Sequence, residues 1–194
     1  TRSDIRILDC QDPPNNMAEL YRHQFRDHFI SAMQAEMGSI KGMNAMEERV
    51  MPEDRKAVPL TWKFAYKSNG QFIARFKARI CVRGDLQKSG IDYNPDDIYA
   101  PVMRGVTLRV SVAFNGTNRK MWITAGDITT AFLNAKPTRD VYVYDPKGFP
   151  SKDPGKRLLL LRSLYGLCQS PKEWYECLRA WLRDNGYIQS KSDP

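Results

Sequence analysis

The 194-residue sequence has few of the features that mark several protein classes. No apolar run approaches the roughly 20 residues that a membrane-spanning helix needs, so we expect no membrane span. The four cysteines stand far apart without a C-x-x-C pair, which argues against a zinc site or a disulfide framework and favours reducing, intracellular surroundings. The two histidines, His23 and His28, have no cysteine near them, and we expect both on the surface. No serine or cysteine nucleophile has a matching base, so a catalytic triad has little support.

Acidic residues are also in short supply, because 22 Asp and Glu face 30 Lys and Arg and leave a formal charge of +8. Such a surplus favours phosphate-bearing partners over neutral ones. Apolar residues at 42% and charged residues at 27% are globular proportions, and the length suits one ordinary domain or two small lobes. The chain starts at Thr1 without a secretory pattern, and we expect it to be a piece of a longer, non-secreted protein.

The first third of the chain contains one clear helical pattern. Residues 1–16 are polar and predict a linker or an extended lead-in. Asn16 can cap a helix over residues 17–37, with Glu19 as its capping-box partner. Residues 38–58 predict an irregular connection. Later segments predict a loop over 84–105, a short helix over 108–114, a strand over 121–125, a helical turn over 128–133 and strands over 141–144 and 158–161.

The best-specified helix comes last. Ser170 is the expected cap, Pro171 takes the first helical position, and Glu173 completes a capping box. The helix is expected to stop at residues 185–186, an Asn-Gly pair. Its apolar stripe, which we expect in the core, consists of Trp174, Cys177, Leu178, Trp181 and Leu182.

Two strictly alternating runs, residues 60–67 and 72–83, predict a β-hairpin with one aromatic and one basic face. A two-residue turn would put aromatics and arginines on the same face, whereas a three-residue loop, Ser68-Asn69-Gly70, pairs Phe64 with Ala74. We therefore expect the three-residue loop, with its glycine in the left-handed region.

The basic face of this hairpin is the first candidate site, and it consists of Lys63, Lys67, Arg75, Lys77, Arg79 and Arg83. The expected register sets Lys63 directly across from Arg75. Like charges opposed across strands are destabilising, so the face makes most sense if an anion lies over it. The alternative is a solvated face that protects the sheet from edge pairing. We favour phosphate binding because the face carries no acidic residue.

Asp127 is the second candidate. It follows the apolar run 121–125 and Gly126, and we expect it at the end of a strand with a helical turn after it. Strand ends are where ligands and metals are often held. An isolated aspartate in this position caps a helix at least as often as it binds a metal. Spacing alone leaves both roles open.

Several strings of residues then stand in a recognisable order. They are Lys77-Ala78-Arg79, Gly90-Ile91-Asp92-Tyr93, Ala100-Pro101-Val102, Asp127 with Ala131-Phe132-Leu133-Asn134, Val141-Tyr142, Ser163-Leu164-Tyr165-Gly166-Leu167 and Gln169-Ser170-Pro171. Together they resemble the reverse transcriptase of copia-type long-terminal-repeat retrotransposons, from about residue 29 to residue 193. The chain departs from the common pattern at Cys168, where a basic residue is usual, and at Lys172, where Arg is usual.

The resemblance implies an α+β fold with a mixed or antiparallel sheet and packed helices, as the fingers and partial palm of a right-hand polymerase. Residues 17–120 would be the fingers-like region and residues 121–194 the partial palm. The implied partners are an RNA/DNA template-primer, deoxynucleoside triphosphates and the rest of the polyprotein: integrase upstream, and the remaining palm, thumb and RNase H downstream. The implied location is a cytoplasmic particle, the nucleus or both.

The resemblance also implies roles for single residues. Asp127 would be the first of three catalytic aspartates and a ligand of Mg²⁺, and the other two belong to a Tyr-x-Asp-Asp hairpin that this sequence does not contain. Lys67 and Arg79 would grip the triphosphate. Arg75 and Lys77 would be their neighbours, Phe132 would exclude a ribose 2′-hydroxyl, and Gln169 would hydrogen-bond near the nucleotide. By pattern alone, Phe132 is equally well a core residue of a short helix.

Three functions follow from these expectations. The first is the RNA-directed DNA polymerase region of a retrotransposon polyprotein, inactive as this piece alone. The second is a non-catalytic nucleic-acid-binding remnant of a degenerate element, in which the basic face binds backbone phosphates and no metal site forms. The third is a purely structural basic face that binds nothing tightly.

Overall fold

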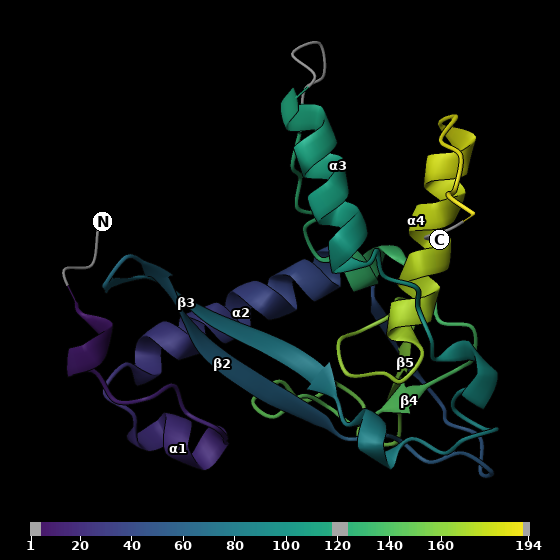
Figure 1. Ribbon diagram of the computed structural model, residues 1–194. Helices are drawn as coiled ribbons and strands as arrows, with labels where there is room; N and C mark the ends of the chain where they lie inside the picture. Colours follow the sequence, from purple (N-terminus) through teal and green to yellow (C-terminus); the bar gives the residue numbers. More distant parts are fainter. Residues whose placement is uncertain (1–4, 118–123, 192–194) are drawn as a thin grey trace.

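The computed structural model describes residues 5–117 and 124–191. These residues form an antiparallel three-stranded sheet in the order β1–β5–β4, a two-stranded hairpin of β2 and β3, and packed helices, which confirms the mixed α+β class (Figure 1). The elements are α1 (Met17–Arg22), α2 (Arg26–Gly42), β1 (Met46–Arg49), β2 (Leu60–Asn69), β3 (Phe72–Val82), α3 (Gly105–Thr117), β4 (Tyr142–Val143), β5 (Arg157–Leu160) and α4 (Ser170–Asp184). Short 3-10 turns cover Ile7–Asp9, Gly84–Leu86, Pro95–Asp97 and Ala131–Asn134.

The N-terminal helical pattern forms two helices, so the prediction of one helix over 17–37 was wrong. Asn16 does cap α1, because its side chain accepts the Glu19 amide at 3.0 Å. The chain turns at His23, which has an extended backbone. The His23 ring is buried, contrary to expectation; its Nδ1 accepts the Phe25 amide at 3.0 Å, and its Nε2 lies 3.1 Å from the Asp12 carbonyl. These bonds replace the helical ones at the break, whereas His28 is exposed as expected.

The expected irregular connection over residues 38–58 is partly regular. Helix α2 continues to Gly42, and β1 follows as a strand that pairs with β5 from Met46 opposite Leu160 to Arg49 opposite Arg157. Strand β1 lies at the edge of its sheet, so its alternate residues are exposed and its charged sequence is tolerated.

The hairpin keeps the predicted faces but not the predicted register. Phe64 lies opposite Ala78 and not Ala74, because the turn consists of two residues, Gly70 and Gln71, and the register shifts between Lys67 and Ser68. A two-residue turn alone would mix the two faces, and the shift restores the aromatic and basic separation. Gly70 has a φ of +65°, as expected for this turn.

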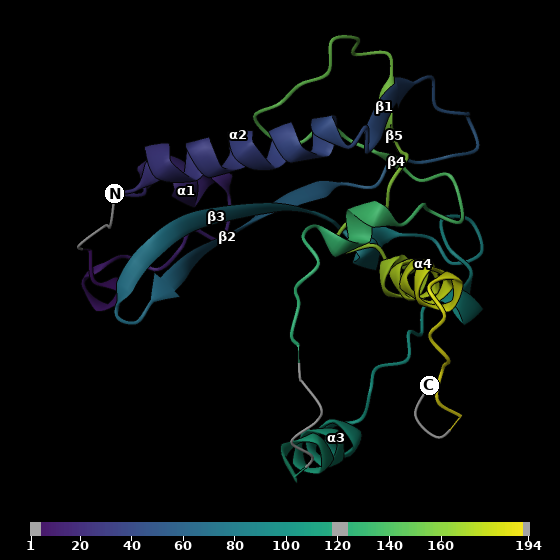
Figure 2. The same ribbon diagram turned by 90° about the horizontal axis from the view of Figure 1, so that it is seen from above.

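Helix α2 lies along the aromatic face of the hairpin (Figure 2). The ring of Phe29 is completely buried and contacts Phe64, Tyr66 and Phe76 with centroids 5.2 to 5.6 Å apart. Further residues of this core come from both elements: Met33, Met37 and Ile40 of α2, and Trp62, Ala78 and Ile80 of the hairpin. The helix therefore covers one face of the hairpin and leaves the basic face open.

The three-stranded sheet joins early and late parts of the chain. It combines β1 with β4 and β5, and the Val58 amide donates to the Tyr142 carbonyl at 2.8 Å just before β2 begins. The strands expected over 141–144 and 158–161 are β4 and β5, with slightly different bounds. The hairpin and the sheet consequently share one core, which fixes the hairpin relative to the segments that follow β5.

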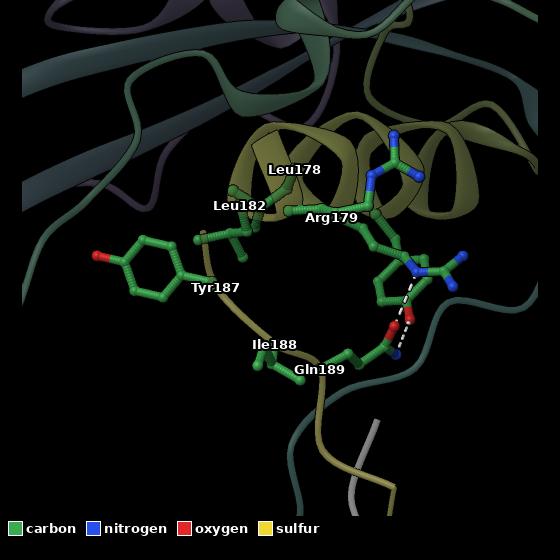
Figure 3. Close-up of a pocket in the computed structure, with 8 residues that line it drawn as sticks. Leu178, Arg179, Leu182, Tyr187, Ile188 and Gln189 are labelled. Carbon is green, nitrogen blue, oxygen red and sulfur yellow. Dashed lines mark hydrogen bonds between the residues drawn. The ribbon is translucent and has the colours of Figure 1, made fainter. Parts of the chain in front are cut away.

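Helix α4 forms where expected, but its cap and its core face differ from the prediction. The Ser170 hydroxyl donates to the Leu164 carbonyl at 2.6 Å and does not cap the helix. The buried Glu173 carboxylate accepts the Thr138 amide at 2.7 Å and the Ser163 hydroxyl, so it ties three segments together. Trp181 is 58% exposed, contrary to the prediction, and Leu178 and Leu182 line a groove together with residues 187–189 (Figure 3).

Helix α3, expected as a shorter helix over 108–114, contains no buried residue and stands apart from the rest of the molecule (Figure 2). Its side chains at Val106, Leu108, Val110, Val112 and Phe114 are exposed. Neither it nor any other helix within residues 5–117 and 124–191 has the length and apolar character of a membrane-spanning segment.

Candidate functional site

The register of the hairpin opposes like charges at two places on the basic face. Lys63 lies directly across from Arg79, and Lys67 lies directly across from Arg75, so the expected pairing of Lys63 with Arg75 was wrong. Lys77 lies opposite Ala65, between these two pairs. Each like-charged pair costs stability unless an anion neutralises it. The face therefore carries two such pairs where the sequence predicted one.

The cations of the basic face act on one another electrostatically. The pKa of Lys77 is lowered, first by partial burial and then by the positive charges of Arg79, Lys67 and Arg75. One acid reaches this edge of the hairpin from α2: Glu36, whose pKa is raised chiefly by burial although Lys77 and Arg79 pull it down. Glu36 thus offsets part of the positive charge of Lys77 and Arg79.

Arg83 differs from the other members of the basic face. It follows the end of β3 and forms a 2.7 Å ion pair with Asp85, with both side chains about half exposed. The expectation that no acid accompanies these cations therefore fails at Arg83. The open part of the face is Lys63, Lys67, Arg75, Lys77 and Arg79.

Arg79 and Phe132 meet on the same ring, that of Tyr165. The Arg79 guanidinium lies 4.8 Å from the centroid of Tyr165, a cation–π contact, and the Phe132 ring packs against Tyr165 edge-on with centroids also 4.8 Å apart. Two of the predicted site residues, 53 positions apart in the sequence, are thereby brought together. The resemblance implied that the segment 165–171 shapes the nucleotide pocket, but Tyr165 was given no role of its own.

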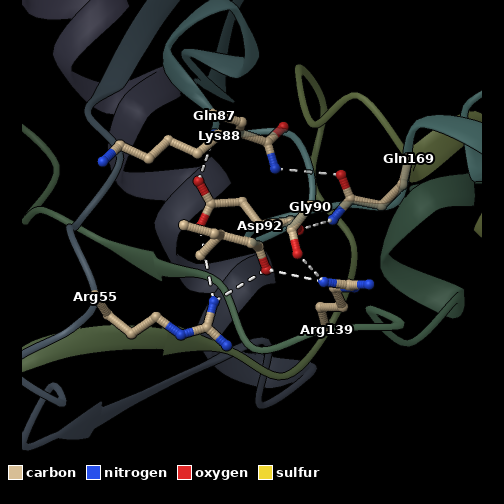
Figure 4. A network of polar contacts seen from close by, with 8 residues as sticks. Arg55, Gln87, Lys88, Gly90, Asp92, Arg139 and Gln169 are labelled. Carbon is tan, nitrogen blue, oxygen red and sulfur yellow. Dashed lines mark hydrogen bonds and ion pairs between the residues drawn. The ribbon is translucent and has the colours of Figure 1, made fainter.

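Gln169 does not lie on the basic face. Its side chain is completely buried; its Oε1 accepts from Gln87 Nε2 at 3.2 Å, and its Nε2 donates to the Asp92 carbonyl at 3.2 Å (Figure 4). Both ends of the amide are therefore used within the protein. The sequence offered no signal for this arrangement, because Gln169 lies 82 residues from Gln87 and 77 residues from Asp92 along the chain.

Asp127 is exposed, and residues 124–128 form neither strand nor helix. The strand expected over 121–125 is thus absent at positions 124 and 125, while positions 121–123 lie outside the described residues. A strand persists only where a neighbouring strand takes up its backbone groups, and residues 124–127 pair with no described strand. The turn expected over 128–133 is the 3-10 turn Ala131–Asn134.

Within residues 5–117 and 124–191, no group of three or more His, Cys, Asp and Glu side chains lies close enough to hold a metal ion. Mg²⁺ sites in proteins need several oxygen ligands, and a pair of such ions needs more than one carboxylate. The described residues therefore do not by themselves form the magnesium site that the resemblance implies.

Comparison with known proteins supports the resemblance. A family model described as reverse transcriptase (RNA-dependent DNA polymerase) matches residues 45–193. The retrovirus-related Pol polyprotein from transposon TNT 1-94 of Nicotiana tabacum is 30% identical over 194 residues, which cover 98% of this chain. Those from transposons RE1 and RE2 of Arabidopsis thaliana are 35% identical over 145 residues, 73% of this chain, and 31% identical over 172 residues, 86% of this chain.

The chain spans only a small part of these curated relatives, namely 14% of the TNT 1-94 polyprotein, 10% of the RE1 polyprotein and 12% of the RE2 polyprotein. No solved structure matches the chain.

Proposed function

Because the chain belongs to the reverse transcriptase (RNA-dependent DNA polymerase) family, as a region of a copia-type retrotransposon Pol polyprotein, we propose that it forms the fingers and the first part of the palm of an RNA-directed DNA polymerase. Residues 17–120 are the fingers-like region in this proposal, and residues 121–194 are the partial palm. The single observation that carries the proposal is the basic face, with its two opposed pairs of like charges.

The basic face binds the triphosphate of an incoming deoxynucleotide in this proposal. Lys67 and Arg79 make the principal contacts, and Arg75 and Lys77 are their neighbours. A triphosphate supplies the negative charge that would relieve the repulsion within the two pairs. Arginine suits this task because its planar guanidinium can donate two parallel hydrogen bonds to phosphate oxygens. Phe132, which packs on the same Tyr165 ring as Arg79, contacts the sugar in this proposal.

Asp127 is the proposed metal-binding carboxylate of the parent polymerase, which needs further acids for a complete Mg²⁺ site. Family members generally use divalent metal ions. The proposed partners are a template-primer, deoxynucleoside triphosphates and the remainder of the polyprotein. We propose an intracellular location, in a cytoplasmic particle or the nucleus.

Replacing Arg79 or Lys67 by alanine is expected to weaken binding of dTTP to the chain at low ionic strength. A hydrogen bond to a charged group contributes about 1.5–3 kcal/mol, so each variant should lose about 10- to 100-fold in affinity. Calorimetric titration of the wild-type chain and both variants measures the effect.

The matched control is Arg26→Ala, which removes one exposed arginine of α2 that pairs with Asp27, away from the basic face. It changes the net charge as much as Arg79→Ala and should leave dTTP affinity nearly unchanged. Equal losses in Arg26→Ala and Arg79→Ala would mean that only net charge matters, which would contradict a defined site.

A second function rests on the same basic face, with its two opposed pairs of like charges. It is binding of nucleic-acid phosphates by the basic face without catalysis, as in a degenerate element. This function shares the phosphate contacts with the first and differs only in the role of Asp127. Primer extension by the parent protein therefore separates the two.

A further inference from the structure

Tyr165 lies between the two predicted nucleotide contacts, Arg79 and Phe132. Tyr165 touches both, one on its ring face and one edge-on. Arg79 comes from β3 and Phe132 from the 3-10 turn Ala131–Asn134, and Tyr165 bridges these two elements. Because the pairing of β2 with β3 holds Arg79, a displacement of the Tyr165 backbone would move Phe132 relative to Arg79.

The backbone of Tyr165 is held against the end of β3. Its carbonyl accepts the Val82 amide at 2.8 Å. The next residue, Gly166, passes so close to Val82 that a Cβ atom at this position would collide with the Val82 backbone. In the same way, a Cβ atom on Gly84 would collide with the Gly166 carbonyl oxygen. Two glycines thus allow the end of β3 and the segment that carries Tyr165 to cross at close range.

The segment after this crossing is fixed by a pair of glutamine side chains. Gln87 Oε1 accepts the Cys168 amide at 2.8 Å, and Gln87 Nε2 donates to Gln169 Oε1 at 3.2 Å. Gln169 in turn donates to the Asp92 carbonyl at 3.2 Å. These bonds link the loop after β3 to the segment between β5 and α4 (Figure 4).

Residues 88–92, in the loop after β3, are held by contacts within the loop and by two arginines from other segments. The Asp92 carboxylate is buried, accepts the Lys88 amide at 2.7 Å and lies 3.9 Å from an Arg55 nitrogen. Arg55 also donates to the Ile91 carbonyl at 3.0 Å, and Arg139 donates to the Gly90 carbonyl. Contacts with Arg55 and Arg139 therefore tie down the loop that carries Gln87.

We infer that Gln87 and Gln169 form a positioning pair that holds Tyr165, and through Tyr165 the proposed sugar contact Phe132 beside Arg79, while neither glutamine touches the nucleotide. This inference rests on the proposed function and deepens it. Contacts held in place before the ligand arrives cost less to order when it binds, so loss of the pair lowers affinity without removing a contact.

The test is a titration of the chain and its variants with dTTP and, separately, with inorganic tripolyphosphate. Gln87→Ala and Gln169→Ala are each expected to weaken dTTP binding by about tenfold, and the double variant by no more than either single one, because the pair acts as a unit. Tripolyphosphate affinity should stay within about twofold of wild type, since the hairpin's own pairing holds the basic face. Gln34→Ala, an exposed glutamine of α2, is the control.

A milder variant keeps the test valid if the alanine variants fail to fold. Gln87→Glu keeps an acceptor for the Cys168 amide and loses only the donor to Gln169, so its dTTP affinity should lie between wild type and Gln87→Ala. A parallel fall in dTTP and tripolyphosphate affinity would indicate general unfolding and overturn the inference. Loss in Gln169→Ala with an unchanged Gln87→Ala would show direct contact by Gln169 and overturn it as well.

Failure of the proposed function has a different signature. If the wild-type chain binds neither probe, or if Arg79→Ala binds dTTP as well as wild type, the basic face is not the triphosphate site. If Arg79→Ala weakens binding and both glutamine variants leave it unchanged, the site stands and the positioning pair is wrong.

Discussion

A Gly166→Ala variant is expected to lose about 3–5 kcal/mol of unfolding free energy. Gly166 has a φ of +92°, which strains any other residue, and an added Cβ would lie only 3.0 Å from the Val82 nitrogen and closer still to the Val82 carbonyl oxygen. Neither backbone segment can move away easily, because the Val82 amide donates to the Tyr165 carbonyl. Overpacking and backbone strain then add. Urea unfolding followed by tryptophan fluorescence measures the loss.

Gly186→Ala is the matched control for this prediction. Gly186 has a similar φ of +84°, but no atom lies within 4 Å of an added Cβ. This variant should lose only about 1 kcal/mol, the cost of the left-handed backbone alone. If both variants unfold at the same urea concentration, the close crossing of Gly166 and Val82 is absent in solution.

Asp127→Asn is expected to abolish primer extension by the parent polymerase that contains this region. Asparagine keeps the size of the side chain and removes its negative charge, so it binds a divalent cation far more weakly. Metal ions supply several kcal/mol of transition-state stabilisation, and loss of a ligand carboxylate should therefore reduce the rate by at least about 10³-fold. Single-nucleotide incorporation on a primed RNA template measures the rate.

Asp140→Asn is the control, because Asp140 is also exposed and lies in the same region of the chain. Its incorporation rate should equal that of the wild type. Extension that survives Asp127→Asn would remove Asp127 from the metal site. A wild-type parent that binds template-primer but extends nothing would instead favour the non-catalytic function.

The hairpin illustrates what the sequence can predict. Strict alternation over two runs identified both strands and separated the aromatic from the basic residues. The register depends on one local irregularity between Lys67 and Ser68, and nothing in the residue types marks it. The register shift cancels the effect of the two-residue turn on which side of the hairpin each side chain faces. The prediction of an aromatic and a basic face was therefore confirmed, whereas the predicted partner of Lys63 was wrong.

Other predictions of secondary structure and site contacts failed because contacts between distant parts of the chain decide the structure there. The break between α1 and α2 depends on the buried ring of His23, which bonds to segments before and after it. Strand β1 is charged and was missed because its partner, β5, lies more than 100 residues away. The Arg79, Tyr165 and Phe132 contact and the buried position of Gln169 arise only from the fold. Motif strings located these residues but could not state what each one touches.

The central claim is that a triphosphate binds the open basic face. Its most direct test is an NMR titration of the chain with dTTP that follows the side-chain nitrogen signals of arginine and lysine. The account predicts concentration-dependent shifts at Lys67, Arg75, Lys77 and Arg79, with Arg26 and Arg183 unmoved. Shifts spread evenly over all surface cations, or confined to residues outside the hairpin, would contradict it.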